Sequence, residues 1–94
     1  MAGIQTDYKE LLNFARALRK FADEIEYQIK KLKNETDAVT SYSWRGRQAD
    51  EFSCIVDESK ENMDKQIAYL RDLAEAIDDK AEALRIATSR KMGN

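Results

Sequence analysis

The feature that most constrains the fold is a heptad pattern of apolar residues, which recur at alternating intervals of three and four along most of the 94-residue chain. In the first half the pattern runs through Ile4, Tyr8, Leu11, Ala15, Leu18, Ala22, Ile25, Ile29, Leu32 and Val39. This spacing places apolar side chains along one side of an α-helix. The chain has no proline, and Ala, Glu, Lys, Leu and Arg supply about half of it, a composition typical of long helices. We therefore predict an all-α fold.

The second half of the chain repeats this behaviour at intervals of seven residues. The repeating row is Ala49, Val56, Met63, Leu70, Ile77 and Leu84. The row beside it is interrupted by the polar residues Ser59, Gln66 and Lys80. These interruptions favour a buried face that is tilted towards the row on the other side, which contains Ile67, Ala74 and Ala81.

Residues 41–47 break both patterns and separate the two expected helices, at about 5–40 and about 48–87, with a flexible tail at 88–94. Clustered hydroxyl residues ahead of Gly46 indicate a chain reversal. Asp7, or alternatively Thr6, is the expected cap of the first helix. Ser43 is the expected cap of the second, with Trp44 as its first residue. The sequence thus predicts one antiparallel two-helix hairpin domain over residues 1–94.

Both helices carry apolar stripes that are wider than a single helix contact can cover. Leaving the surplus side chains in water would forfeit on the order of several kcal/mol, comparable with the stability of a small domain. We therefore predict that two hairpins pair into a dimeric four-helix bundle. Each residue assigned to pairing could instead belong to the core of its own hairpin, because one sequence does not assign the stripe edges. The expected pairing residues are Leu11, Phe14, Leu18, Phe21, Ile25, Ile29, Met63, Ile67, Leu70, Ile77 and Leu84.

Charge and composition argue against several classes of function. The 16 basic and 18 acidic residues are mixed along the chain, so no basic stripe for nucleic acid is expected. No apolar run approaches the roughly 20 residues that cross a bilayer, and the N-terminal residues do not resemble a cleavable signal peptide. Cys54 is the single cysteine and there is no histidine, so we expect no internal disulfide, no metal site, no cofactor and no enzyme activity.

The turn sequence Trp44-Arg45-Gly46 lies near the middle of the chain and is followed by Ala49 and Phe52. With a helix expected on each side, the chain resembles the WXG100 family, the small helical-hairpin proteins that bacterial type VII (ESX-like) secretion systems export. The resemblance implies a secreted or cell-surface protein that is cytoplasmic before export. The implied partner is a second copy, another WXG100-like protein or the helical N-terminal domain of a type VII toxin. It further implies that Trp44 and Gly46 form a turn that the secretion ATPase reads together with the C-terminal part of a partner.

The sequence departs from the family in one respect, because exported members commonly carry Tyr-x-x-x-Asp/Glu after the second helix. The fourth residues after the four tyrosines are Leu12, Lys31, Gly46 and Leu73, none of which is acidic. The resemblance thus implies co-export with a partner that carries the signal, or a role as targeting adaptor for a larger toxin. Two alternatives stay open: the turn is structural only, or the chain is a generic intracellular coiled-coil interaction protein unrelated to secretion.

Overall fold

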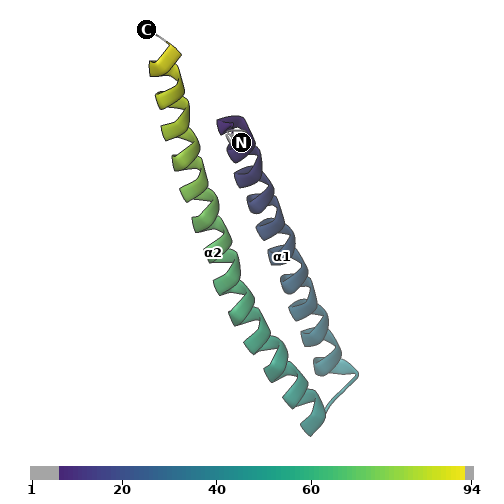
Figure 1. Ribbon diagram of the computed structural model, residues 1–94. Helices are drawn as coiled ribbons and strands as arrows, with labels where there is room; N and C mark the ends of the chain where they lie inside the picture. Colours follow the sequence, from purple (N-terminus) through teal and green to yellow (C-terminus); the bar gives the residue numbers. More distant parts are fainter. Residues whose placement is uncertain (1–6, 93–94) are drawn as a thin grey trace, which may run out of the picture. The chain divides into compact units, whose positions relative to one another are not determined.

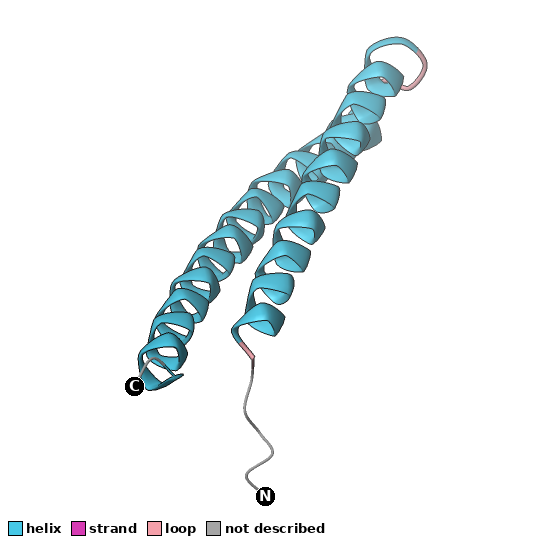
Figure 2. Cartoon of the chain, turned by 90° about the horizontal axis from the view of Figure 1, so that it is seen from above, coloured by secondary structure: helices cyan, strands magenta, loops and turns pink. Residues whose placement is uncertain are grey.

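The computed structural model describes residues 7–92 and the side chains of residues 7–89. Two helices, α1 (Tyr8–Tyr42) and α2 (Arg47–Met92), are joined by residues 43–46 (Figure 1). Figure 2 shows that the described residues are helical except for this turn and Asp7. The predicted all-α helical hairpin is therefore confirmed, whereas its pairing into a four-helix bundle stays a prediction.

The hairpin divides into two compact units. Unit 1 contains the described residues up to Phe21 together with those from Tyr69 onwards, and unit 2 is Ala22–Ala68. In each unit a segment of α1 and a segment of α2 lie antiparallel, side by side (Figures 1 and 2). Unit 2 also contains the turn, so it holds the residues that the sequence pattern singles out most strongly.

Asp7 caps the start of α1, as one of the two predicted alternatives requires. The backbone N–H of Lys9 donates to Oδ1 of Asp7 at 3.1 Å, and the N–H groups of Glu10 and Leu11 donate to its carbonyl oxygen at 3.0 and 3.2 Å. Such bonds satisfy amides that have no partner inside the first turn of a helix. The alternative cap, Thr6, and the expected helical residue 5 lie outside the described residues.

The turn differs from the expected arrangement at the start of α2. The N–H groups of Ser43 and Trp44 both donate to the carbonyl oxygen of Val39, at 2.9 and 2.8 Å, so they complete the end of α1. The N–H of Asp50 donates to the carbonyl oxygen of Gly46 at 3.0 Å, and α2 begins at Arg47. Ser43 therefore does not cap α2 and Trp44 is not its first residue, because α2 begins only at Arg47 and both residues precede it in the turn.

At its other end, α2 continues to Met92, so residues 88–92 are helical where the sequence pattern predicts a flexible tail. The apolar periodicity fades there, but no proline or glycine interrupts the chain before Gly93. Loss of amphipathic pattern removes packing without removing backbone hydrogen bonds. The expected tail residues 93 and 94 lie outside the described part of the chain.

The contact between the helices is built mainly from small residues. In unit 1 the buried residues are Ala15, Ala74 and Ala81, and in unit 2 they are Ala22, Ile29, Thr36, Ala49, Val56 and Ile67. No large side chain among the described residues is fully buried. Because hydrophobic stabilisation is proportional to the apolar area removed from water, an alanine seam stabilises the hairpin only weakly. Apart from Ile29 and Ile67, the larger apolar side chains lie beside this seam rather than in it.

The buried face of α2 changes row along the helix. Ala49 and Val56 are buried near the turn, whereas Ile67, Ala74 and Ala81 are buried further along. The step from Val56 to Ile67 is eleven residues, which is close to three full turns of an α-helix. A strict seven-residue row drifts by about 20° per heptad around a straight helix, so the neighbouring row takes over. The predicted tilt towards Ile67, Ala74 and Ala81 is confirmed.

Candidate partner-binding surface and turn

Gly46 is required by the backbone conformation of the turn. Its φ of 114° lies in a region that residues with a side chain rarely adopt. A Cβ atom built on Gly46 would meet nothing within 4 Å, so close approach of another segment is not the reason for a glycine here. A glycine here could allow either a tight turn or the close approach of another segment, and the structure supports the tight turn.

Arg45 is a turn residue that sequence reasoning missed. Its Nη2 donates to the carbonyl oxygen of Ser41 at 2.6 Å, so the side chain folds back onto the last turn of α1. Carbonyl groups at a helix C-terminus lack intrahelical partners, and a cationic side chain there also complements the helix dipole. The signal that could have identified it is an arginine placed just after the last residue that follows the heptad pattern.

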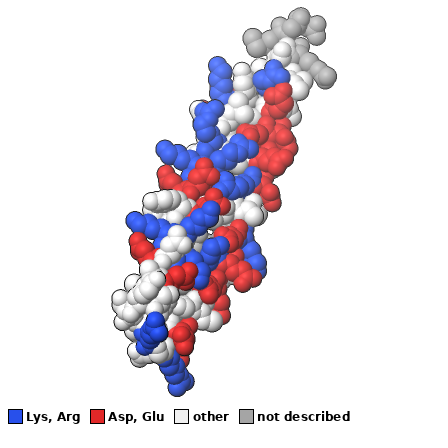
Figure 3. All heavy atoms as spheres, turned by 180° about the vertical axis from the view of Figure 1, so that it is seen from behind, with Lys and Arg blue, Asp and Glu red and all other residues white. Residues whose placement is uncertain are grey.

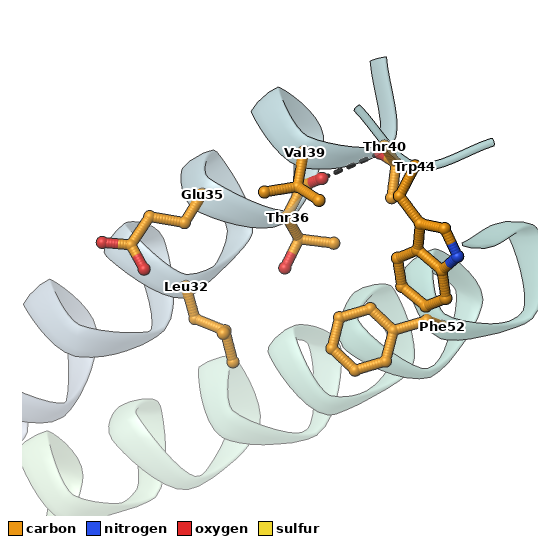
Figure 4. Close-up of a pocket in the computed structure, with 7 residues that line it drawn as sticks. All are labelled: Leu32, Glu35, Thr36, Val39, Thr40, Trp44 and Phe52. Carbon is orange, nitrogen blue, oxygen red and sulfur yellow. Dashed lines mark hydrogen bonds between the residues drawn. The ribbon is translucent and has the colours of Figure 1, made fainter. Parts of the chain in front are cut away.

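Trp44 packs on Phe52 at the start of α2, with ring centroids 5.6 Å apart and planes tilted by 49°. The two rings form one wall of an open depression of about 160 Å³, whose other lining residues come from α1 (Figure 4). Figure 4 shows the indole nitrogen on the ring edge that faces away from Leu32 and Thr36, so the depression is bounded mainly by apolar atoms. The lining residues are Leu32, Glu35, Thr36, Val39, Thr40, Trp44 and Phe52.

In both units, ion pairs between the helices mark one side of the seam. In unit 1, Arg19 Nη1 lies 2.6 Å from Asp78 Oδ2. In unit 2, Lys33 Nζ lies 2.6 Å from Asp57 Oδ1 and 2.9 Å from Asp37 Oδ1. The hydrogen bonds to Asp57 and then Asp37 raise the pKa of the Lys33 ammonium above its ordinary value.

Charged side chains of both signs are interspersed on the face shown in Figure 3, with a mostly uncharged region towards the turn. No single-sign patch forms there. This face therefore does not carry the continuous basic stripe that phosphate binding requires.

The apolar side of unit 1 lies opposite its ion pair. At 100° per residue, Arg19 lies about 40° to one side of the buried Ala15, whereas Leu18 and Phe14 lie about 60° and 100° to the other side. Around Ala74, Asp78 is displaced in the same sense as Arg19 around Ala15, and Leu70 and Leu73 are displaced in the opposite sense. This side contains Leu11, Phe14, Leu18, Phe21, Leu70, Leu73, Ile77 and Leu84, which we call the unit 1 apolar side.

Unit 2 has the same organisation. Lys33 and Leu32 lie on opposite sides of the buried Ile29, and Asp57 and Phe52 lie on opposite sides of the buried Val56. Leu32, Val39, Phe52 and Met63 are 42%, 46%, 40% and 40% exposed, respectively. The unit 2 apolar side therefore contains the depression beside Trp44, together with Ile25 and Met63.

The predicted pairing residues fall into three groups by exposure. Phe14, Phe21 and Met63 are exposed, with each phenylalanine 53% accessible. Ile29 and Ile67 are only 8% and 4% exposed, because they pack between the two helices of their own hairpin, so we place them in the internal core. The half-buried residues are Leu11, Leu18, Ile25, Leu70, Ile77 and Leu84.

Four further residues share the apolar sides but were missing from the predicted pairing set. Leu32, Val39, Phe52 and Leu73 are exposed on the same sides of α1 and α2 as the predicted residues. Leu32 and Val39 continue the seven-residue row of Leu11, Leu18 and Ile25. That row was the signal that could have identified them.

Two kinds of feature are absent from the described part of the chain, and its cysteine is exposed. Among those residues no group of His, Cys, Asp and Glu side chains could hold a metal ion, and no helix is long and apolar enough to span a membrane. Cys54 is exposed, and its Sγ donates to Oε1 of Glu58 at 3.7 Å. The charge of Glu58 raises the pKa of the Cys54 thiol, which lowers its fraction of reactive thiolate.

Comparison with protein families gives a match over most of the chain. The family model for WXG100, described as proteins of 100 residues with WXG, matches residues 3–87. This match covers α1, the turn and α2 as far as residue 87, and it confirms the resemblance noted from Trp44 and Gly46. Searches of curated proteins and of solved structures returned no match.

Proposed function

Because the chain belongs to the WXG100 family, we propose that it acts in type VII secretion as a dimeric secreted substrate, co-substrate or targeting adaptor that works through helix–helix contacts. Members of the family are small helical hairpins of the type VII secretion kind and are not known enzymes. The proposed partner is a second copy, another WXG100-like protein or the helical N-terminal domain of a type VII toxin.

The observation that carries this proposal is the contrast between a thin seam and large exposed apolar side chains. The seam consists mostly of alanines, while Phe14 and Phe21 are each 53% exposed. Full burial of a phenylalanine side chain stabilises by about 1.5–3 kcal/mol, so each leaves roughly half of that unrealised in a lone hairpin. A second helical hairpin that covers the apolar sides recovers this free energy and completes a four-helix bundle.

The route of export follows from a missing motif. No tyrosine among these 94 residues is followed by an acidic residue at the fourth position, which is the pattern common among exported members. We therefore assign it co-export with a partner that supplies the signal, or service as an adaptor for a larger toxin. In this scheme the protein is cytoplasmic before export and afterwards lies outside the cell or at its surface.

The turn supplies a surface that the secretion machinery could read. Trp44 is 36% exposed although it packs on Phe52, so one part of the ring holds the turn and the other part faces outwards. An aromatic ring fixed by its own packing loses little conformational entropy when a partner covers it. We propose that Trp44 is recognised during export as well as stabilising the hairpin.

Export from a bacterium with a functional type VII system tests the proposal. Culture filtrate and cell lysate are compared by immunoblot in that strain and in an isogenic strain lacking the secretion ATPase, with a cytoplasmic lysis marker. ATPase-dependent appearance in the filtrate, alone or with a co-expressed partner, is the expected result. If the protein stayed in the cell both alone and with every co-expressed partner, the result would instead favour an intracellular coiled-coil protein.

Variants at the turn separate recognition from folding. Trp44→Ala should reduce export of a chain that still dimerises, because the outward ring is lost. The matched control is Tyr42→Ala, which removes an aromatic side chain that is 84% exposed beside the same turn. Normal export of a folded Trp44→Ala protein would leave the turn with a structural role only.

A further inference from the structure

The depression beside the turn combines an apolar surface with an acidic end. All 7 of its lining residues belong to unit 2, so its shape does not depend on unit 1. Figure 4 shows the rings of Trp44 and Phe52 at one end and Glu35 at the other, with Thr36 and Val39 between them. A group that fills this depression therefore meets apolar atoms first and a carboxylate at its far end.

Two polar groups of the depression have no partner among the described residues. Glu35 is exposed and forms no ion pair with any of them. Thr36 is only 5% exposed, and Figure 4 shows its hydroxyl oxygen pointing between Leu32 and Phe52. That hydroxyl forms no hydrogen bond with a described residue, whereas the hydroxyl of Thr40 donates to the Thr36 carbonyl oxygen at 2.8 Å. A protein that covers both groups must supply hydrogen-bond donors, because a carboxylate only accepts.

The size of the depression suits one side chain. Its volume is about 160 Å³, whereas pockets for small molecules measure roughly 300–1,000 Å³ and enclose most of the ligand surface. Trp44 and Phe52 remain 36% and 40% exposed although they line it. A side chain carried on a larger protein surface covers such an open site better than a free ligand does.

Arginine has the chemistry that this combination requires. Its methylene groups cover apolar surface such as the two rings and Val39, and its guanidinium offers several N–H donors to Glu35 and Thr36. An acidic side chain would be repelled by Glu35, and an aliphatic one would leave both polar groups unpaired. A lysine ammonium is more strongly hydrated, so it loses more when a partner covers it.

A second copy of the chain is a poor source of this arginine. Each arginine whose side chain the structure describes already interacts with a residue of its own hairpin, so a second copy would have to break one of these interactions. These residues are Arg16, Arg19, Arg45, Arg47, Arg71 and Arg85.

From these observations we propose that the depression binds an arginine side chain of an unlike protein, with its methylene groups on Trp44 and Phe52 and its guanidinium on Glu35 and Thr36. The inference rests on the proposed function, in which a further protein recognises the turn, and it specifies the chemistry of that protein. A protein without an arginine at this place would cover the carboxylate and the hydroxyl without a partner, so the depression discriminates among proteins of similar apolar surface.

Two capped helical peptides test the proposal on the full chain. Both consist of alanine and glutamine, and they differ only at one central residue, which is arginine or its uncharged isostere citrulline. Binding is followed at low salt through the indole N–H signal of Trp44, the single tryptophan of the sequence, in ¹H–¹⁵N NMR spectra. We expect the arginine peptide to bind about three- to fivefold more tightly than the citrulline peptide.

Glu35→Gln removes the charge and keeps the shape of the side chain. It should weaken binding of the arginine peptide by about three- to fivefold and change binding of the citrulline peptide by less than about twofold. The matched control is Glu24→Gln, since Glu24 lies about 200° around α1 from the buried Ala22. This control should bind both peptides as the wild type does, and circular dichroism shows whether each variant keeps its helices.

The coupling between Glu35 and the arginine decides the outcome. If the wild type does not prefer arginine over citrulline, or if Glu35→Gln keeps the full preference, the inference is wrong, while the export assay still tests the proposed function. Equal affinity for the arginine peptide and for N-acetyl-L-arginine N-methylamide would overturn a protein as the source. Weaker self-association of Glu35→Gln in sedimentation, with arginine peptide competing against it, would make a second copy the occupant and overturn the unlike protein.

Discussion

Replacing Gly46 by alanine tests the turn most sharply, since its φ of 114° and its empty surroundings separate two effects that usually occur together. An L-alanine at this dihedral angle is strained even though its Cβ has room, because the clash is with its own backbone. Holding a residue in such a region costs about 1–3 kcal/mol. For a domain of this size each kcal/mol lowers Tm by about 4–8 °C.

A D-alanine at the same position is the matched control, introduced by chemical synthesis or ligation of the chain. The mirror-image residue accepts positive φ without strain, because its backbone clashes are the mirror image of those of an L-residue. It should therefore be neutral or stabilise by up to about 1 kcal/mol through a restricted unfolded chain. Thermal and urea unfolding followed by circular dichroism at equal protein concentration would measure both. Equal destabilisation by the two alanines would refute the dihedral argument.

Three further perturbations follow from the same structure. Phe21→Glu should weaken dimerisation at least about tenfold and leave a partly helical monomer. The control Tyr27→Glu, on another side of α1, should leave dimerisation unchanged. If sedimentation showed that both variants dimerise equally well, the assigned side of α1 would be wrong. Arg45→Ala should lower the free energy of unfolding by about 1 kcal/mol through loss of the bond to the Ser41 carbonyl, whereas a urea midpoint equal to wild type would exclude that cap. The Arg85 guanidinium donates a hydrogen bond of 3.1 Å to Glu82 and lowers the pKa of that carboxyl group in the folded state. The ion pair therefore stabilises the fold above the unfolded-state pKa of about 4.3, and its contribution is lost as pH falls through the lower folded-state pKa. Glu82→Gln should reduce the dependence of the free energy of unfolding on pH in this acid range, measured by urea titrations at several pH values. An unchanged pH dependence would contradict the assignment.

The helices were predictable because their periodicity is long and local chemistry agrees with it. The seven-residue rows around Ala15 and Ala74 identify the buried sides, and the polar interruptions at Ser59, Gln66 and Lys80 indicate the shift of the buried face in α2. These signals depend only on the 3.6-residue period of a helix. Fold class and helix pairing therefore follow from the sequence.

The details of the turn were not predictable in the same way. Whether Ser43 caps α2 depends on the residue at which α2 begins, and propensities alone favour the capping role. In the structure the N–H of Ser43 donates to the carbonyl oxygen of Val39, Trp44 lies in the turn, and α2 begins at Arg47. Positive φ at Gly46 is the backbone feature that makes this reversal geometrically feasible.

The sequence also did not determine which apolar residues are buried within the hairpin and which are exposed beside it. Ile29 and Ile67 have the same apolar character and spacing as the other predicted pairing residues, yet they are buried within the hairpin. Leu32 and Val39 follow an equally apolar row and remain exposed. The difference depends on how each helix is rotated about its own axis, which the heptad pattern determines only to within one row.

The central claim is that the alanine seam is too thin to hold the hairpin alone and that the apolar sides require a second hairpin. Sedimentation equilibrium of the purified chain, with circular dichroism and thermal melting of the same sample, tests it most directly. The account predicts a helical, cooperatively melting species of twice the 10.9 kDa chain mass. A poorly helical monomer would retain the claim and transfer the partner role to an unlike chain. A fully helical, cooperatively melting monomer of 10.9 kDa would contradict it.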